Sequence, residues 1–278
     1  MVLHRALFGE MQKEACLQYR RWYPFPMLSA TLFSSPEQFF IIGLIILISQ
    51  FIYAALGFGS GMFAISILSL LYGRVDLFVP YFVLMCLPTE SLITWKERKL
   101  MKPAKVRSLI IAVTLPLIAG SWLLKRAHGS LLYYLLGSIV ILLSLYHLFW
   151  EEKFRPSLRS PLWVPGIGLF SGLLGGLFGM SGPPLIFYFK AAGFKKREFR
   201  AALLTIFFFM SVIRLLSYLF LGLFTTSLLL SVLITYPFAL AGLWAGSIAH
   251  DRIDEKAFKT ATTLVLLVSG VLIILKNL

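Results

Sequence analysis

The stretch Gly57-Phe58-Gly59-Ser60-Gly61 interrupts a long apolar run of the sequence, and Gly179-Met180-Ser181-Gly182-Pro183-Pro184 interrupts another. When each residue is aligned with the one 121 positions later, Ser60-Gly61 falls on Ser181-Gly182. The same offset aligns Thr114-Leu115-Pro116 with Thr235-Tyr236-Pro237. Two matches at one offset indicate an internal duplication. These stretches, the first and second breaks, are therefore predicted to hold equivalent places in two related halves.

The composition excludes a soluble globular protein. Of the 278 residues, 59% are hydrophobic and only 14% are charged, which is more apolar material than a soluble domain can bury. Apolar runs recur from Phe39 to Leu275, and many approach the ~20 residues that an α-helix needs to cross a bilayer. Outer-membrane barrels alternate apolar and polar residues instead. We therefore predict an all-α integral membrane protein that lies in the lipid bilayer.

The formal charge of +14 is large enough to suggest a nucleic-acid partner. The basic residues, however, lie in short loops between apolar runs, which is the pattern that sets membrane topology. We therefore expect no nucleic-acid partner. Cys16 and Cys86 lie far apart, so neither a disulfide framework nor a metal site is predicted. No stretch resembles a nucleotide-binding loop, so we expect neither ATP use nor a cofactor.

The chain divides into a tail, two membrane repeats and a connector. Residues 1–37 are predicted to form an N-terminal tail, either a surface helix or an upstream extension. The apolar core of a cleaved signal peptide does not stand out there. Repeat 1 covers 38–149, a charged cytoplasmic connector covers 150–161, and repeat 2 covers 162–278.

Each repeat contains five predicted helical segments. The segments that follow the two breaks, 62–72 and 183–192, are too short for an ordinary crossing. The ten predicted segments are 39–56, 62–72, 78–95, 108–124, 131–149, 162–178, 183–192, 200–221, 227–248 and 257–275.

An odd number of segments per repeat makes the second repeat enter the membrane from the opposite side, so we predict inverted repeats. The loop charges agree with this prediction. Loops at 96–107, 150–161, 190–200 and 249–259 contain 17 Lys and Arg residues, whereas the loops of the other side contain four. The positive-inside rule makes the first side cytoplasmic. Both termini are then extracytoplasmic, although the tail adds four basic residues on that side.

A helix that stops inside a membrane leaves backbone N–H and C=O groups without partners, and these must face protein or a cavity. Glycine permits the turn, and Pro183-Pro184 suits the first turn of a new helix. The short segments are therefore predicted to be half-helices whose N-termini, at Ser60-Gly61 and Ser181-Gly182, favour an anion. Alternatively, the glycines only permit close helix packing, for which Gly172, Gly176 and Gly179 have suitable spacing.

Two ionisable residues lie inside predicted spans, where they are functional candidates by default. At the offset of 121, Glu90 aligns with Ser211 and Arg214 with Ile93, so both charges belong to equivalent helices. Arg214 can supply a fixed positive charge to an anion, or it can snorkel to the outer surface. Glu90 can pair with Arg214 or carry a coupled proton. Alternatively, it lies at the cytoplasmic rim beside the basic loop that begins at Lys96.

Two further polar residues are weaker candidates. Gln50 precedes the first break and can line a cavity there, although a buried Gln also hydrogen-bonds neighbouring helices. Lys190 closes the second short segment and is interpreted as a charge at the rim.

An enzymatic reading rests on Gly179-Met180-Ser181-Gly182, which matches the Gly-x-Ser-Gly of rhomboid-type intramembrane proteases. Their serine needs a histidine base from a later membrane helix. The only later histidine is His250, in the charged loop 249–259, where it is badly placed to reach a serine at membrane depth. We therefore predict a protein that is not an enzyme.

The chain resembles the sulfite exporter TauE/SafE family over about residues 39–275. The resemblance rests on both glycine-rich breaks, on Phe199-Arg200-Ala201-Ala202, and on Pro116 and Pro237 with the glycines that follow them, Gly120 and Gly242. The chain departs from the family pattern at Ser60 and Ser181, where consecutive glycines are more usual. Members look like duplicated helical carriers for sulfite and organosulfonates.

The resemblance implies a secondary carrier for a small anion that works by alternating access. Export across the inner membrane, driven by the proton gradient or the membrane potential, is implied by the family as well. No catalytic or metal-binding residue is predicted. The candidate substrate-binding residues are Gly57, Gly59, Ser60, Gly61, Gly179, Ser181, Gly182, Pro183, Arg214, Glu90 and Gln50.

Overall fold

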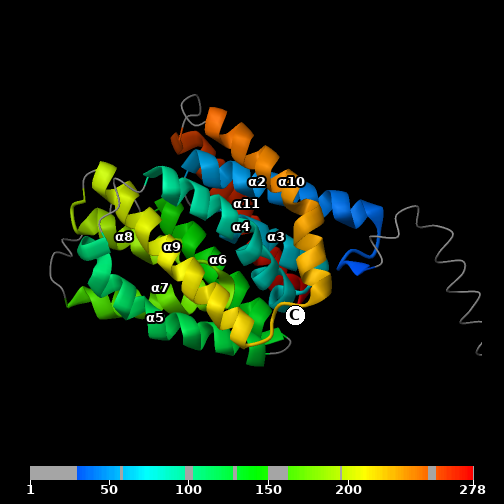
Figure 1. The fold of residues 1–278 in the computed structure, drawn as a ribbon, viewed down its shortest axis with the longest axis horizontal. Helices are drawn as coiled ribbons and strands as arrows, with labels where there is room; N and C mark the ends of the chain where they lie inside the picture. Colours follow the sequence, from blue (N-terminus) through cyan, green and yellow to red (C-terminus); the bar gives the residue numbers. More distant parts are fainter. Residues whose placement is uncertain are drawn as a thin grey trace, which may run out of the picture.

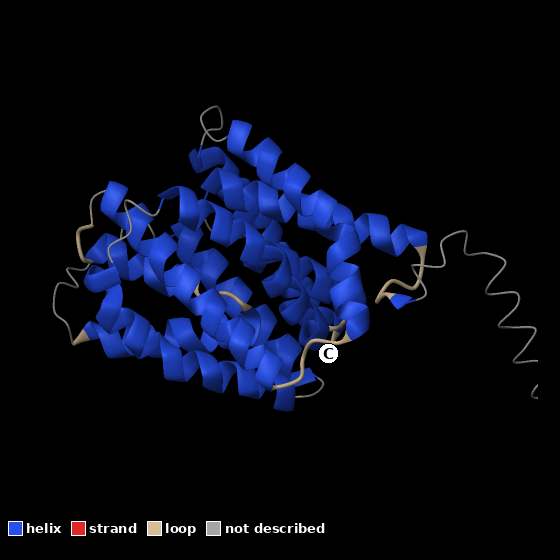
Figure 2. Ribbon diagram, viewed as in Figure 1, coloured by secondary structure: helices blue, strands red, loops and turns tan. Residues whose placement is uncertain are grey.

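The computed structural model describes residues 30–56, 59–97, 103–127, 130–149, 162–194, 196–249 and 255–277. Within these ranges all regular secondary structure is helical (Figure 2), so the predicted all-α class is confirmed. The tail up to residue 29, the connector 150–161 and Gly57 of the first break lie outside the described residues.

Ten helices are described, one for each predicted segment (Figure 1). In chain order they are α2 (Pro36–Leu56), α3 (Ser60–Tyr72), α4 (Val75–Glu97), α5 (Pro103–Arg126), α6 (Ser130–Phe149), α7 (Trp163–Phe178), α8 (Gly182–Ala191), α9 (Lys196–Phe220), α10 (Thr226–Ala249) and α11 (Glu255–Lys276).

Five of these helices are long and apolar enough to cross a membrane, and four shorter apolar helices accompany them. Their outward faces carry large apolar side chains, among them Leu115, Phe220 and Trp244, each more than two-thirds exposed. A soluble fold would bury such side chains, whereas lipid tails solvate them. The chain is therefore a multi-pass membrane protein. The five long candidates are Pro36–Ala55, Val75–Leu92, Val106–Arg126, Ala201–Phe220 and Thr226–Ala249.

The two halves of the chain interlock. The most extensive helix pair is α5 with α7, and the next is α2 with α10. Figure 1 shows α5 and α7 along one side of the molecule and α2 and α10 along the opposite side. At the sequence offset of 121, α2 corresponds to α7 and α5 to α10. The first helix of each half thus packs on the fourth helix of the other half, as a duplicated fold would arrange them.

Glycines bring these helix pairs into backbone contact. A Cβ atom built on Gly176 of α7 would lie 2.1 Å from the Leu117 carbonyl oxygen of α5. One built on Gly242 of α10 would lie 2.1 Å from the Leu47 carbonyl oxygen of α2. Gly172 meets α5 in the same way, with 2.6 Å to the Val113 carbonyl oxygen. The packing role considered for the glycines of α7 therefore describes Gly172 and Gly176.

The Thr-x-Pro matches also have a shared structure. Thr114 donates its hydroxyl to the Ile110 carbonyl oxygen at 2.7 Å, and Thr235 donates to the Ser231 carbonyl oxygen at 2.6 Å. Both bonds run back one turn, and each is followed two residues later by a proline inside its helix. Proline cannot donate the backbone hydrogen bond of its turn and kinks a helix. Helices α5 and α10 thus carry a proline at equivalent positions.

Candidate functional site

Each break is formed around a glycine with a left-handed backbone. Gly59 has φ of +89° directly before α3, and Gly179 has φ of +68° directly after α7. Glycine adopts these values without the steric cost that a Cβ atom brings. The breaks are not copies of one another, because Gly59 aligns with Met180 at the offset of 121.

The second break is held by hydrogen bonds to the end of α7. The Gly179 amide donates to the Gly175 carbonyl oxygen at 3.0 Å, which is the bond of an αL helix cap. The Ser171 hydroxyl donates to the Ser181 carbonyl oxygen at 2.8 Å. These bonds fix where α8 begins relative to α7.

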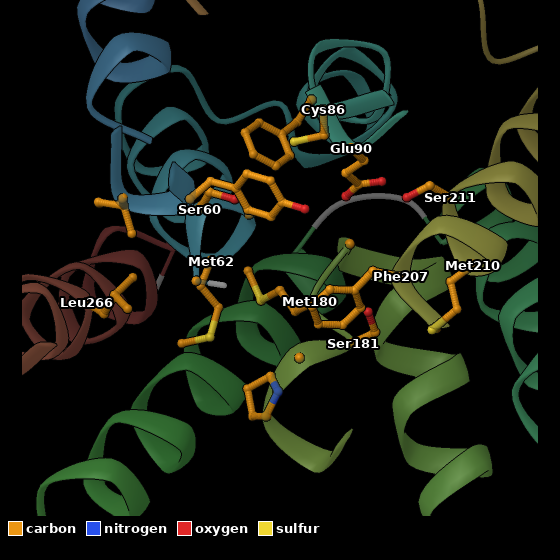
Figure 3. A pocket seen from close by; sticks show the side chains of 18 of the residues that line it. Ser60, Met62, Cys86, Glu90, Met180, Ser181, Phe207, Met210, Ser211 and Leu266 are labelled. Carbon is orange, nitrogen blue, oxygen red and sulfur yellow. The ribbon is translucent and has the colours of Figure 1, made fainter. Parts of the chain in front are cut away.

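Both breaks line one cavity in the middle of the bundle (Figure 3). It offers about 80 Å³ to the centres of water molecules, several times the space that one buried water needs. Helices α2, α4, α9 and α11 complete the wall. The lining residues are Ile52, Tyr53, Gly59, Ser60, Gly61, Met62, Phe82, Cys86, Glu90, Gly179, Met180, Ser181, Gly182, Pro183, Phe207, Met210, Ser211, Arg214, Thr262, Thr263 and Leu266.

Many of the lining residues correspond to one another in pairs when the two halves are aligned at the offset of 121. Glu90 and Ser211 are equivalent positions, and Figure 3 shows the Glu90 carboxylate pointing towards Ser211. This arrangement is compatible with a pseudo-twofold relation between the two halves. The six pairs in the lining are Gly59 with Met180, Ser60 with Ser181, Gly61 with Gly182, Met62 with Pro183, Cys86 with Phe207, and Glu90 with Ser211.

Arg214 is only 7% exposed, so it does not snorkel to the surface. Its Nη1 donates to the Gly175 carbonyl oxygen at 3.1 Å and its Nη2 to the Ser211 hydroxyl at 3.3 Å. Its Nε has no hydrogen-bond partner among the described residues. Gly179 lies against the guanidinium, since a Cβ atom built there would be 3.0 Å from Nη1. A buried guanidinium thus lies directly beside the second break.

Glu90 is 9% exposed and lines the same cavity from α4. Its Oε2 has no hydrogen-bond partner in the described part of the chain. The pairing with Arg214 considered from the sequence is not formed as an ion pair, because the two described side chains make no contact within 4.0 Å of the kind that joins Arg74 to Asp76. The burial of Glu90 also differs from that of a carboxylate at an exposed rim.

The helix starts differ in the donors they offer. In α3, Ser60, Gly61 and Met62 have no acceptor within their own helix, while the Phe63 amide donates to Gly59 at 3.0 Å. In α8, two of the first four residues are prolines, which carry no N–H. The helix start of the first break is therefore the richer source of backbone donors. The second break adds the nearby guanidinium instead.

Gln50 reaches this wall only indirectly. Its side chain is fully buried, and its Nε2 donates to Cys86 Sγ at 3.4 Å. Sequence reasoning missed the sulfur atoms of Cys86 and the methionines in the wall, because such residues read as ordinary core. It also missed the contribution of α11, for which the polar dipeptide Thr262-Thr263 in an apolar helix was the available signal.

Comparison with known proteins agrees with this architecture. The family model of the sulfite exporter TauE/SafE matches residues 41–273. A probable sulfite/organosulfonate exporter TauE of Cupriavidus necator is 35% identical over 97 residues, which cover 34% of this chain and 36% of that protein. The match therefore spans about a third of that relative's length. No solved structure matches the chain.

The matched range contains both breaks and every residue that lines the cavity. The family consists of transporters rather than enzymes, and nothing supports the rhomboid-type alternative. The chain is a member of the sulfite exporter TauE/SafE family of membrane transporters.

Proposed function

We propose that the chain is a secondary carrier that exports a small anion across the inner membrane by alternating access. The observation that carries the proposal is the buried Arg214 guanidinium in a cavity to which both helix breaks contribute. A charge is costly to bury, and a guanidinium that forms no ion pair with the Glu90 carboxylate of the same cavity is well suited to receive an anion.

The polar groups of the cavity match an oxyanion. The N-terminus of α3 supplies backbone donors and the positive end of a helix dipole. The hydroxyls of Ser60 and Ser181 lie in the same wall and can donate as well. Sulfite, an organosulfonate or a related inorganic or organic anion presents the several acceptor oxygens that such a set requires. The similarity to the probable sulfite/organosulfonate exporter of Cupriavidus necator supports this substrate class.

The transport route follows from the predicted topology. We propose inverted repeats with the basic loops in the cytoplasm and both termini outside. Glycine-broken helices that meet at the interface of two such repeats are the arrangement in which many carriers bind their substrate. Movement of the helices that line the cavity would then expose it to each side in turn.

The test is anion flux into proteoliposomes that contain the purified chain, with a panel of sulfite, sulfonates, sulfate and chloride. Arg214→Gln removes the buried charge and is compared with Arg74→Gln at an exposed ion pair. A hydrogen bond to a charged group contributes about 1.5–3 kcal/mol, so Arg214→Gln should weaken anion affinity about 10- to 150-fold. Arg74→Gln should leave it unchanged.

Ser181→Ala separates the carrier from a serine hydrolase, because a carrier retains flux without this one hydroxyl. If no anion of the panel is transported and none stabilises the protein against heat, the proposal fails. It also fails if Arg214→Gln binds and transports anions as the unmodified chain does.

A further inference from the structure

A carboxylate occupies the cavity in which we place an anion. Glu90 is buried, and its Oε2 has no hydrogen-bond partner among the described residues. Two negative charges in one buried cavity repel strongly, because little water screens them there. A site for an anion alone would not require a carboxylate in its wall. Glu90 therefore needs a role that the proposed function does not yet give it.

Among the described residues that line the cavity, Arg214 is the only charged neighbour of Glu90. Helix α9 contributes Arg214 and Ser211, α2 contributes the neutral Tyr53, and α4 itself contributes Cys86. The lining from both breaks, α3 and α8 consists of glycine, serine, methionine and proline, and α11 contributes threonine and leucine. Helix α10 also packs on α4, where its Thr235 hydroxyl lies 2.5 Å from the Tyr81 hydroxyl.

The cavity has two states in which its charges sum to zero. When it is empty, the Arg214 guanidinium and the Glu90 carboxylate sum to zero. When a monovalent anion binds while Glu90 stays ionised, the cavity carries a net negative charge. When the anion arrives together with one proton on Glu90, the sum is zero again. A buried cavity favours the neutral states, because uncompensated charge loses its hydration.

We infer that Glu90 is a proton-binding group and that the carrier moves one proton together with each monovalent anion, without net transfer of charge. The inference rests on the anion site proposed above. A proton from water binds a Glu90 carboxylate oxygen as the anion takes the guanidinium, and it returns to water on the far side when the anion leaves. An outward anion gradient that exceeds the inward pH gradient then drives export without help from the membrane potential.

Glu90→Gln gives the cavity a neutral amide of the same shape, like a permanently protonated Glu90. The loaded cavity stays neutral, but the empty cavity now carries the charge of Arg214 when it returns. Exchange of internal for external anion never uses the empty carrier, so it should persist. Net flux should become dependent on the membrane potential and lose its response to a pH gradient.

The experiment measures labelled sulfite and methanesulfonate in proteoliposomes with imposed pH gradients and potassium diffusion potentials. Methanesulfonate is the anion of a strong acid, so a proton that accompanies it travels on the protein. For the unmodified chain we expect acid outside to accelerate uptake of either anion and an imposed potential to leave it unchanged. For Glu90→Gln we expect intact exchange, no pH response of methanesulfonate uptake, and net uptake accelerated by an inside-positive potential.

The inference is overturned if the unmodified chain responds to the potential but not to the pH gradient. It is also overturned if a folded Glu90→Gln protein keeps the pH response of methanesulfonate uptake or loses exchange. If Glu90→Gln does not fold, the responses of the unmodified chain to the pH gradient and to the membrane potential still test the inference. Absence of flux and exchange for every anion would instead refute the proposed carrier itself.

Discussion

Replacement of Gly176 by alanine should weaken the fold more than any other single-methyl change in α7. The new Cβ atom would lie 2.1 Å from the Leu117 carbonyl oxygen, 2.7 Å from the Ser121 nitrogen and 3.0 Å from the Leu117 carbonyl carbon. Ordinary contacts begin at 3.4 Å, so the closest atom must move by about 1.3 Å. All three atoms belong to the backbone of α5. No side-chain rotation can therefore relieve the clash.

The size of the effect follows from the packing. Adding a methylene to a well-packed interior costs about 1–3 kcal/mol, and a clash with backbone belongs at the upper end. Alanine regains up to about 1 kcal/mol of helix propensity over glycine. The net loss in free energy of unfolding is then about 2 kcal/mol. At about 2–4 °C per kcal/mol for a protein of this size, Tm should fall by about 4–8 °C.

Gly166→Ala is the matched control in the same helix. No atom lies within 4 Å of a Cβ atom built there, so the change should be neutral or raise the stability by about 0.5–1 kcal/mol. Gly242→Ala tests the equivalent α2–α10 contact and should resemble Gly176→Ala. The assay is thermal unfolding in detergent, followed by size-exclusion chromatography of heated samples. Equal Tm values for Gly176→Ala and Gly166→Ala would refute the reasoning.

Three smaller changes test individual contacts. Tyr218→Phe removes the 2.6 Å bond to the Gly176 carbonyl oxygen and should lower the free energy of unfolding by about 1 kcal/mol; an unchanged Tm would mean that this bond adds nothing. Ser171→Ala removes the bond to Ser181 and should lower Tm by a few degrees while weakening anion affinity, whereas unaltered affinity would separate the second break from the site. Gly73→Ala strains a cap with φ of +63° and should cost about 1 kcal/mol, with Gly73→Asn less harmful; the reverse order in the thermal assay would contradict the left-handed cap.

The order of the helices was predictable because the bilayer imposes a length on each apolar run. The positions of the breaks were predictable as well, since Gly59 and Gly179 interrupt otherwise continuous apolar sequence. Arg214 and Glu90 stood out because a charge inside a span is costly. Each of these signals is a local departure from an apolar background. Sequence alone can find such departures.

The cavity wall was less predictable, because most of its residues resemble the apolar residues around them in the sequence. Met180, Met210 and Phe207 look like any buried apolar residue until the fold turns them towards a shared space. Gln50 was expected at the site because it is polar and close in sequence, yet the turn of α2 directs it to Cys86. Side-chain direction depends on tertiary packing, which one sequence read along its length does not contain.

The packing glycines and the break glycines have complementary consequences for transport. Gly176 and Gly242 bring α5 against α7 and α10 against α2 at backbone distance, where sliding would drive side chains into carbonyl groups. These two pairs therefore resist relative movement. Each pair joins one half of the chain to the other, so the halves cannot simply rock as separate bodies. In the proposed cycle, the movement has to fall on the parts between the pairs, namely the short helices α3 and α8 and the contact of α4 with α9. Those parts carry both breaks, Glu90 and Arg214, so in this cycle a change of charge in the cavity would act directly on the elements that have to move.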